Sequence, residues 1–369
     1  ASTGVADFIL PPEEMPAQLV ACLSHPYTTR HDWQQQALAD ETGMTRLFSL
    51  LRARTKVDFT HYKPSTITRR VERRIAVTQV SDLDAYVSYV EQTPSEIAAL
   101  YRELLIGVTS FFRDPEVMAK LQESALPQLL EQSADRELRF WVAGCSTGEE
   151  AYTLAILARE AMESLGLARD VKVFATDIDR DAVAKAAAGV YPESIAADLS
   201  PALLTKYFYS RGDRYQVTRT IREMVVFAQH NLVRDPPFTR TDLVSCRNLL
   251  IYLQTNLQQL ALEMLNFSLR PGGILLLGTS ESVGDMEDCF EPVDRKARIF
   301  RSLGKPHGGV EARAVSVASS EDARLPLVAF GQARPTRTGA REGERLLVRL
   351  LDALADTCVP LAVVVNEHL

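Results

Sequence analysis

One stretch constrains the fold of this chain more than any other, because a strand, a glycine-containing turn and a helix follow one another without a break over residues 139–158. Residues 138–143 are rich in aromatic and β-branched side chains, which is typical of a buried strand. The turn at 144–148 has glycine at both ends, so its backbone can approach a ligand closely. A helix is expected to begin at Glu149 or Glu150, with its free N–H groups facing the end of the strand. The segment predicts either an ordinary strand-to-helix connection or a cradle for a nucleotide-derived cofactor.

The chemistry of this turn separates two kinds of cofactor. The turn does not have the GxGxxG spacing of a dinucleotide-binding loop, and Glu149 would repel a pyrophosphate at the helix N-terminus. A cationic or amine-bearing cofactor is therefore favoured over a dinucleotide.

Three further runs typical of β-strands also end in polar residues. Residues 171–176 lead into Asp177, 28 residues after Glu149, and an acid at the tip of a second strand commonly binds ribose hydroxyls. Residues 224–228 precede His230-Asn231-Leu232, and 242–246 precede Arg247-Asn248. Open α/β sheets bind ligands at the carboxyl ends of their strands, so we expect these polar tips to share one edge.

The remaining elements predict the fold class. A turn at 270–273 leads into a buried strand at 274–278, and residues 297–301 are expected to pair with it at the edge of the sheet. Alternating, turn-punctuated residues within 207–228 predict a small antiparallel excursion. We therefore expect a Rossmann-like α/β domain with a small antiparallel subdomain, preceded by an all-helical N-terminal domain. This layout is typical of an S-adenosylmethionine methyltransferase.

Ordered motifs give the chain a specific resemblance. They are LLIGVTSFFRDP at 104–115, followed by AGCSTGEEAYTLA, FATDID, HNL, CRNLLIYL and GTSES. In this order, over about residues 40–303, they resemble the chemotaxis receptor glutamate methyltransferases, the CheR family. Residues 5–16 resemble the end of the partner methylesterase, and residues 350–369 resemble the opening of a PAS sensor domain. The resemblance implies a piece of a methylesterase–methyltransferase–PAS fusion.

The resemblance also implies a set of contacts to S-adenosylmethionine and its product S-adenosylhomocysteine. The residues concerned are Thr109, Arg113, Gly144, Glu149, Asp177, Asn231, Leu232, Arg247 and Asn248. Thr109 and Arg113 are expected at the cofactor's carboxylate, and Glu149 at its ammonium group. Asp177 is expected at the ribose, with Asn231 and Leu232 flanking the adenine. Arg247 and Asn248, assigned as the catalytic pair, are expected to line the pocket near the sulfonium.

At one position the chain departs from the family pattern. Gly107 stands where the family usually has Asn, so one side-chain contact to the cofactor is lost and a water could substitute.

The implied reaction is methyl transfer to a glutamate carboxylate of a chemoreceptor. Such a carboxylate, with an ordinary pKa of about 4.3, is ionised at neutral pH and needs no general base. The lack of a Ser/His/Asp arrangement is therefore compatible with catalysis. Two alternatives remain open: a scaffold that binds the cofactor without turnover, and a methyltransferase for small molecules.

The excess of basic residues at 45–80 predicts where the substrate docks. Residues 45–80 hold nine Lys or Arg and two acids within a chain of net charge −7. A helix after Pro64 would present Arg69, Arg70, Arg73 and Arg74 as a basic face, which suits the acidic helical bundle of a receptor's cytoplasmic domain. A merely solvated surface is the alternative. Nucleic acid is not expected, because the strip is short and lacks interleaved aromatic residues.

Composition and segment pattern complete the expectations. The five cysteines form no CxxC pair, which gives no indication of a metal or a disulfide framework. There is no signal peptide and no apolar run that could insert in a membrane, so a cytoplasmic location is expected. The expected parts are a tail at 1–30, a helical docking domain at 31–115, the methyltransferase domain at 116–303, a flexible linker at 304–344 and, at 345–369, a helix with the start of the PAS-like domain. The excursion near Arg211 is short, which predicts docking without a receptor pentapeptide.

Overall fold

The computed structural model describes residues 10–23, 41–105, 107–132 and 136–304. The expected linker at 304–344, apart from Gly304, and the expected helix and PAS-like start at 345–369 lie outside these residues. None of the helices within the described ranges combines the length and apolar character needed to cross a membrane.

The N-terminal part is helical; the sequence predicted helices within residues 31–115, and the structure adds one at Met15–Leu23, within the expected tail at 1–30. Its elements are α1 (Met15–Leu23), α4 (Glu41–Thr55), the 3-10 turn η1 (Phe59–His61), α5 (Pro64–Thr78), α6 (Leu83–Gln92) and α7 (Pro94–Leu104). Pro64 occupies the first turn of α5, where its missing N–H has no intrahelical partner to lose. Asp82 caps α6 by accepting the N–H of Ala85 at 2.8 Å. One side each of α4, α5, α6 and α7 forms a shared apolar core.

The second part is built on a seven-stranded sheet in the order β6-β2-β1-β7-β8-β10-β9. The first five are parallel, and β10 and β9 run antiparallel. The strands are β1 (Leu138–Ala143), β2 (Val171–Asp177), β6 (Val225–Gln229), β7 (Thr241–Cys246), β8 (Leu269–Leu277), β9 (Phe290–Asp294) and β10 (Ile299–Ser302). The outermost strand is β9, which the sequence did not predict. Residues 270–273 form an irregularity within β8 rather than a turn before it.

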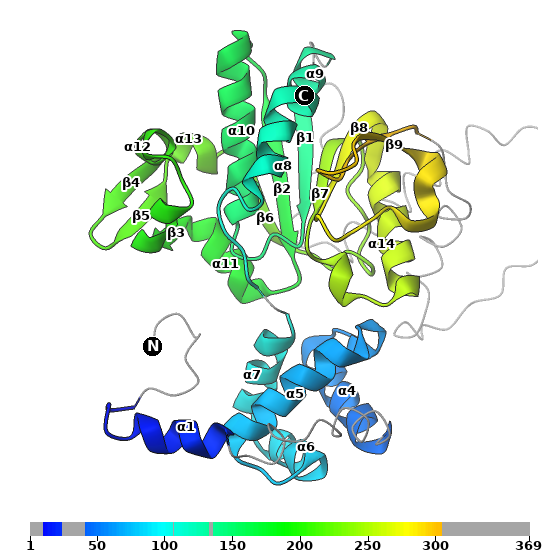
Figure 1. Ribbon diagram of the computed structural model, residues 1–369. Coiled ribbons are helices and arrows are strands. Elements are labelled where there is room, and N and C mark those ends of the chain that lie inside the picture. The colour runs from blue at the N-terminus through cyan, green and yellow to red at the C-terminus, as the bar shows by residue number, and fades with distance from the viewer. Residues whose placement is uncertain (1–9, 24–40, 106, 133–135, 305–369) are drawn as a thin grey trace, which may run out of the picture. The chain divides into compact units, whose positions relative to one another are not determined.

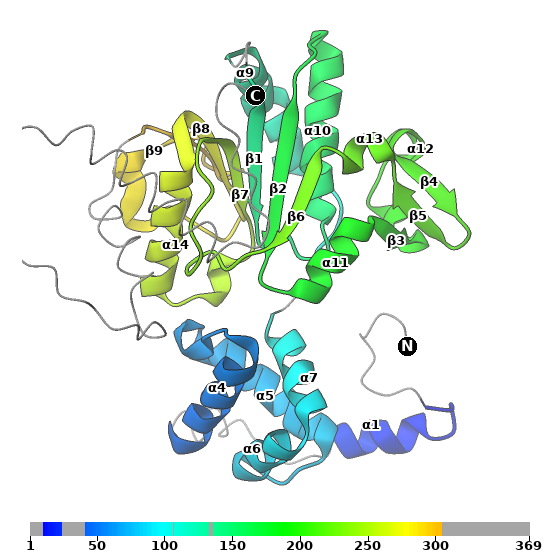
Figure 2. The same ribbon diagram turned by 180° about the vertical axis from the view of Figure 1, so that it is seen from behind.

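Helices cover both faces of this sheet (Figures 1 and 2). Along β1, Phe140 and Val142 face one apolar core, while Trp141 and Ala143 face the other. The first core includes residues of α8, α9 and α10, and the second includes α14. These and the other helical elements are α8 (Pro115–Lys120), the π-helical η2 (Leu121–Ala125), α9 (Leu126–Gln132), α10 (Glu149–Leu165), α11 (Arg180–Ala188), η4 (Leu250–Tyr252), α14 (Thr255–Ser268) and η5 (Gly284–Cys289).

The expected antiparallel excursion is present as a separate sheet in the order β3-β5-β4. It comprises β3 (Val190–Pro192), β4 (Phe208–Arg211) and β5 (Arg214–Val217), with η3 (Glu193–Ala197), α12 (Pro201–Tyr207) and α13 (Arg219–Arg222) around it. The sequence predicted the hairpin of β4 and β5 but not β3. The fold class, an α/β methyltransferase-like domain preceded by helices, is as predicted.

Candidate functional site

The polar strand ends predicted from the sequence lie on four adjacent strands. Strands β6, β2, β1 and β7 are neighbours and run parallel, so their carboxyl ends share one edge of the sheet. Asn231 follows β6, Asp177 ends β2, Gly144 follows β1 and Arg247 follows β7. This is the edge at which open α/β sheets bind ligands.

The turn after β1 is fixed against β2 by backbone hydrogen bonds. The N–H groups of Gly144 and Cys145 donate to the carbonyl of Thr176 at 2.8 and 2.9 Å. Gly144 has φ 79° and Gly148 φ 95°, conformations that favour glycine. A Cβ on Gly148 would also stand 2.8 Å from Cβ of Ala186. The turn therefore needs glycine at both ends for backbone and steric reasons.

Asp177 joins this turn to the end of β2. Its Oδ2 accepts the N–H of Ser146 at 2.7 Å, and its Oδ1 accepts the N–H of Asp179 at 2.9 Å. Burial raises the pKa of the Asp177 carboxyl above its ordinary value. An ionised carboxylate offers about four acceptor positions, so two bonds leave room for further donors such as hydroxyl groups.

Glu149 is a buried acid without a cationic partner among the described residues. It is the first residue of α10 and is 9% exposed. Both carboxylate oxygens accept from the hydroxyl of Thr147, at 2.9 and 2.7 Å. Burial raises the pKa of its carboxyl. A buried carboxylate held only by one hydroxyl and its own backbone N–H fits a ligand that brings a positive charge.

Arg247 does not extend freely into solvent at this edge. Its fully buried guanidinium forms ion pairs with Asp114, Nη2 to Oδ2 at 2.6 Å, and with Glu150, Nη1 to Oε2 at 3.0 Å. It also donates to the carbonyl of Arg113 at 2.9 Å, while Glu150 accepts the hydroxyl of Ser245 at 2.6 Å. Arg247 thus ties the end of β7 to α10 and to the segment before α8. Sequence reasoning missed both acidic partners, and the only signal was the second acid in the Glu149-Glu150 pair.

The segment before α8 carries the two residues expected at the cofactor's carboxylate. Arg113 is partly buried, and its Nη1 donates to the carbonyl of Val108 at 2.9 Å. No carboxylate of the described residues pairs with it, so its remaining N–H groups can serve an anionic ligand group. Thr109 is also partly buried. The carbonyl of Gly107 accepts a hydrogen bond from the hydroxyl of Ser146 at 3.2 Å. The Ser146 hydroxyl therefore lies beside Gly107, the position at which the family usually has Asn.

The segment after β6 is held by its own hydrogen bonds. The N–H of Asn231 donates to Asp235 at 2.7 Å, and its Oδ1 accepts the N–H of Val233 at 3.2 Å. Leu232 is buried in the same apolar core as Trp141. The structure thus provides a fixed polar backbone and an apolar side chain where an adenine is expected.

Four of the eight left-handed residues other than glycine in the described part of the chain belong to the segments discussed above. Phe112, Asp114, Ser146 and Asn248 all have φ between 48° and 58°. Such left-handed conformations are uncommon for residues other than glycine and persist where the surroundings enforce them, often in functional sites.

The predicted basic face lies on α5, but its exposed part is smaller than the sequence predicts. Arg74 is buried and pairs bidentately with Glu96, both bonds being 2.8 Å. Arg73 is exposed but pairs with Glu103 at 2.5 Å, and the partly buried Arg70 stands 3.8 Å from the same carboxylate. Arg69 is exposed. Arg74 therefore belongs to the interior of the helical part and does not add to the exposed basic face.

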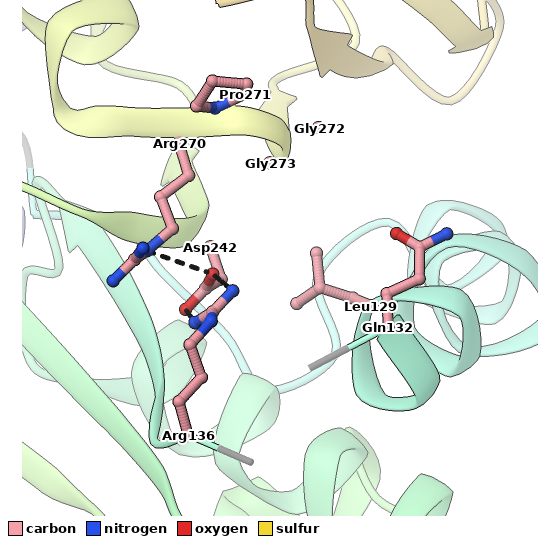
Figure 3. A pocket seen from close by; sticks show the side chains of 8 residues that line it. All are labelled: Leu129, Gln132, Arg136, Asp242, Arg270, Pro271, Gly272 and Gly273. Atoms are coloured by element: carbon pink, nitrogen blue, oxygen red, sulfur yellow. Dashed lines mark hydrogen bonds and ion pairs between the residues drawn. The ribbon is translucent and has the colours of Figure 1, made fainter. Parts of the chain in front are cut away.

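A separate pocket of about 150 Å³ lies at the opposite edge of the sheet. Figure 3 shows Asp242, near the start of β7, between Arg136 and Arg270. Arg136 donates to both carboxylate oxygens, at 2.8 and 2.5 Å, and Arg270 stands at 3.7 Å. The charge of Asp242 is thus already compensated, and this pocket is remote from the carboxyl-end residues.

Comparisons with known proteins agree with this geometry. Residues 42–105 match the all-alpha domain of CheR methyltransferases, and residues 107–299 match their SAM-binding domain. The chain is 30% identical over 277 residues to chemotaxis protein methyltransferase 2 of Vibrio cholerae, covering 73% of this chain and 94% of that protein. It is 32% identical over 261 residues to chemotaxis protein methyltransferase 2 of Pseudomonas aeruginosa, covering 69% and 87%.

A further relative is much longer. An uncharacterised 104.1 kDa protein of Rhodobacter capsulatus is 44% identical over 271 residues, which are 73% of this chain, and the chain spans 28% of that protein's length. The two domain matches confirm the family and the cofactor, S-adenosylmethionine, that the sequence motifs predict. The chain belongs to the CheR methyltransferase family.

Proposed function

We propose that this chain transfers a methyl group from S-adenosylmethionine to glutamate carboxylates of chemoreceptor cytoplasmic domains, giving methyl esters. The observation that carries the proposal is the edge formed by β6, β2, β1 and β7, which carries Asp177 at the end of β2 and, at the start of α10, Glu149, an acid without a cationic partner among the described residues. A cofactor with both an ammonium group and ribose hydroxyls matches these two acids. Membership of the CheR family supports the same substrate class.

The residues at this edge suit different groups of the cofactor. Glu149 would hold the ammonium group, Asp177 the ribose hydroxyls, and Arg113 with Thr109 the carboxylate. Asn231 and Leu232 would flank the adenine. Arg247 would act through its ion pairs by holding the Arg113–Asp114 segment in place. Asn248, whose Oδ1 is buried and unpaired within the described residues, would offer an acceptor.

The chemistry needs alignment more than proton transfer. When bound, S-adenosylmethionine supplies a methyl group attached to a sulfonium. Attack of the acceptor carboxylate on this methyl carbon gives an ester and releases the sulfur as the neutral thioether of S-adenosylhomocysteine. The acceptor is already ionised at neutral pH, so the protein need not remove a proton. Its residues contribute by fixing the reactants in line and by excluding water from the carboxylate.

Docking would use the helical part. Arg69, Arg70 and Arg73 form the exposed or partly exposed basic face of α5, which suits an acidic receptor helix. The β4–β5 hairpin turns through only Gly212 and Asp213. This short hairpin supports docking on the receptor's helical bundle without a pentapeptide tether.

The first prediction tests the class of acceptor. Incubation with methyl-labelled cofactor and a chemoreceptor cytoplasmic domain should label the receptor, and mild alkali should release the label as methanol, because esters hydrolyse where N-methyl groups do not. Replacing the acceptor Glu by Ala in the receptor should abolish labelling. Label that survives alkali would exclude a glutamate acceptor, and cofactor binding without any labelling would favour the scaffold alternative.

A further inference from the structure

Glu281, in the GTSES motif after β8, is a buried acid with an unusual set of partners. It is 4% exposed, and its carboxylate accepts four backbone N–H groups. Oε2 accepts from Gly278 at 2.7 Å and from Asn248 at 3.0 Å. Oε1 accepts from Leu250 at 2.8 Å and from Ile251 at 3.3 Å. Oriented N–H dipoles of this kind compensate a buried negative charge without a cation.

Three of these N–H groups belong to the segment that leaves β7. Asn248 has φ 58°, and the chain then enters η4 at Leu250. A left-handed residue other than glycine needs surroundings that enforce its conformation. The Glu281 carboxylate bonds to the backbone on both sides of this bend. It therefore fixes the direction in which Asn248 and the preceding Arg247 leave the strand.

Gly278 shows how closely the two strand ends are joined. A Cβ at this position would stand 2.7 Å from Oε2 of Glu281 and 2.9 Å from the backbone N of Asn248. Its φ is not in the left-handed region, so space rather than backbone freedom is what requires glycine. The missing side chain lets the carboxylate reach from the end of β8 to the end of β7.

We propose that Glu281 is a positioning residue for methyl transfer: its carboxylate clamps the Arg247–Asn248 segment in the geometry that the cofactor site requires. With four N–H groups on two buried oxygens, Glu281 is not placed to act as a base or to bind the cofactor's ammonium. Its effect passes through Asn248 and through Arg247, which in turn holds Asp114. The inference rests on the proposed role of this segment at the cofactor.

The test measures binding of S-adenosylhomocysteine by calorimetry in the full chain. Glu281→Gln keeps the shape but turns an amide donor towards N–H groups, and Gly278→Ala pushes a methyl group against an intact Glu281. Both variants should bind at least about tenfold more weakly, since each loses or displaces charge-assisted bonds. The matched control is Glu263→Gln, another buried acid of the same domain, 8% exposed on α14, which should bind as the wild type does.

Circular dichroism and melting temperature separate positioning from folding. A merely structural role would lower the melting temperature and leave the affinity of the folded protein unchanged. If folded Glu281→Gln and Gly278→Ala both bind like the wild type, the proposal is wrong. If Glu281→Gln does not fold, the affinity of Gly278→Ala decides. The binding readout needs no receptor, so a failure of receptor methylation in the wild type would contradict the proposed function and leave this test intact.

Discussion

At the scale of single residues, Glu149 carries a charge that its surroundings only partly stabilise. The N-terminus of α10 favours a negative charge there, but burial opposes ionisation, and the pKa is raised as a net result. A positive ligand group beside this carboxylate would favour ionisation and so lower the pKa again. Binding of the cofactor should therefore be linked to loss of a proton.

The second prediction follows from this linkage. Below the raised pKa of the ligand-free protein, Glu149 is partly protonated and binding releases a proton, so the affinity for S-adenosylhomocysteine should rise with pH. The rise should begin above the pKa that Glu149 has in the complex and level off above its raised pKa in the ligand-free protein. Calorimetry in buffers of different ionisation enthalpy measures the proton release. Glu149→Gln should bind more weakly and lose the part of the pH dependence that comes from Glu149, while Asp177, whose pKa burial also raises, keeps its own part. An unchanged profile would mean that the ammonium group does not bind at Glu149.

The third prediction compares two acids at the end of β2. Asp177→Ala should weaken S-adenosylhomocysteine binding by about 1–3 kcal/mol, the typical cost of losing a charged hydrogen-bond partner. The control is Asp179→Ala, because Asp179 caps α11 by accepting the N–H groups of Asp181 and Ala182. Losing that cap should cost about 1 kcal/mol of stability and little affinity. If the two substitutions change the affinity equally, Asp177 does not contact the cofactor.

The sequence identified the strand-end residues but not what their side chains do. A strand followed by Asp177 implies a position at the carboxyl edge, since parallel strands align their ends. The direction of Arg247 depends instead on Asp114 and Glu150, which come from distant parts of the chain. For Glu281, the sequence indicated only its place in the GTSES motif and no role. No local pattern tells that its partners would be backbone N–H groups after β7.

At the scale of elements, α5 has two basic sides with different roles. Helical periodicity places Arg69, Arg70, Arg73 and Arg74 near one another but cannot tell which of them meets an acid inside the domain. Glu96 of α7 and the hydroxyl of Tyr86 of α6 enclose Arg74 in a buried network. The core that forms around it is non-local, and for that reason the sequence overestimated the exposed basic face.

The fourth prediction concerns this network. Arg74→Ala should lower the free energy of unfolding by about 3–5 kcal/mol, because it leaves the carboxylate of Glu96 buried without its cation. Urea unfolding measures the change. Arg69→Ala, on the exposed side of the same helix, should change stability by no more than about 0.5 kcal/mol. A similar small effect for both would mean that the Arg74–Glu96 pair contributes nothing to the fold.

Strand prediction succeeded where apolar runs were long and failed where proline interrupted them. The bounds of β1 are those predicted, β2 and β7 differ by one residue at one end, and β6 is shifted by one residue at both ends. Both missed strands, β3 and β9, contain proline, which restricts a strand to an edge position and weakens its sequence signal. Within β8, Pro271, Gly272 and Gly273 predicted a turn, but pairing with β7 carries the strand across them with a shift in register.

At the scale of the whole molecule, charge is unevenly distributed. Residues 45–80 carry nine basic and two acidic side chains in a chain of net charge −7. The excess of positive charge that this segment presents at the surface is smaller, because Arg74 is buried and Arg70 and Arg73 lie beside Glu103. An acidic receptor should nevertheless be attracted to this part of the chain and repelled by the rest, which orients the encounter.

The last prediction tests this orientation. The rate of receptor methylation at low receptor concentration should fall as salt is added, since screening shortens the range of attraction to about 10 Å at 0.1 M. Binding of S-adenosylhomocysteine, whose charges cancel, should change much less. Arg69→Glu with Arg73→Glu should lower the rate and flatten its salt dependence while leaving cofactor affinity intact. The matched control reverses two exposed charges of the methyltransferase domain, Arg159→Glu with Lys296→Glu. If both double variants slow methylation equally, net charge rather than the face of α5 governs the encounter, and the receptor docks elsewhere.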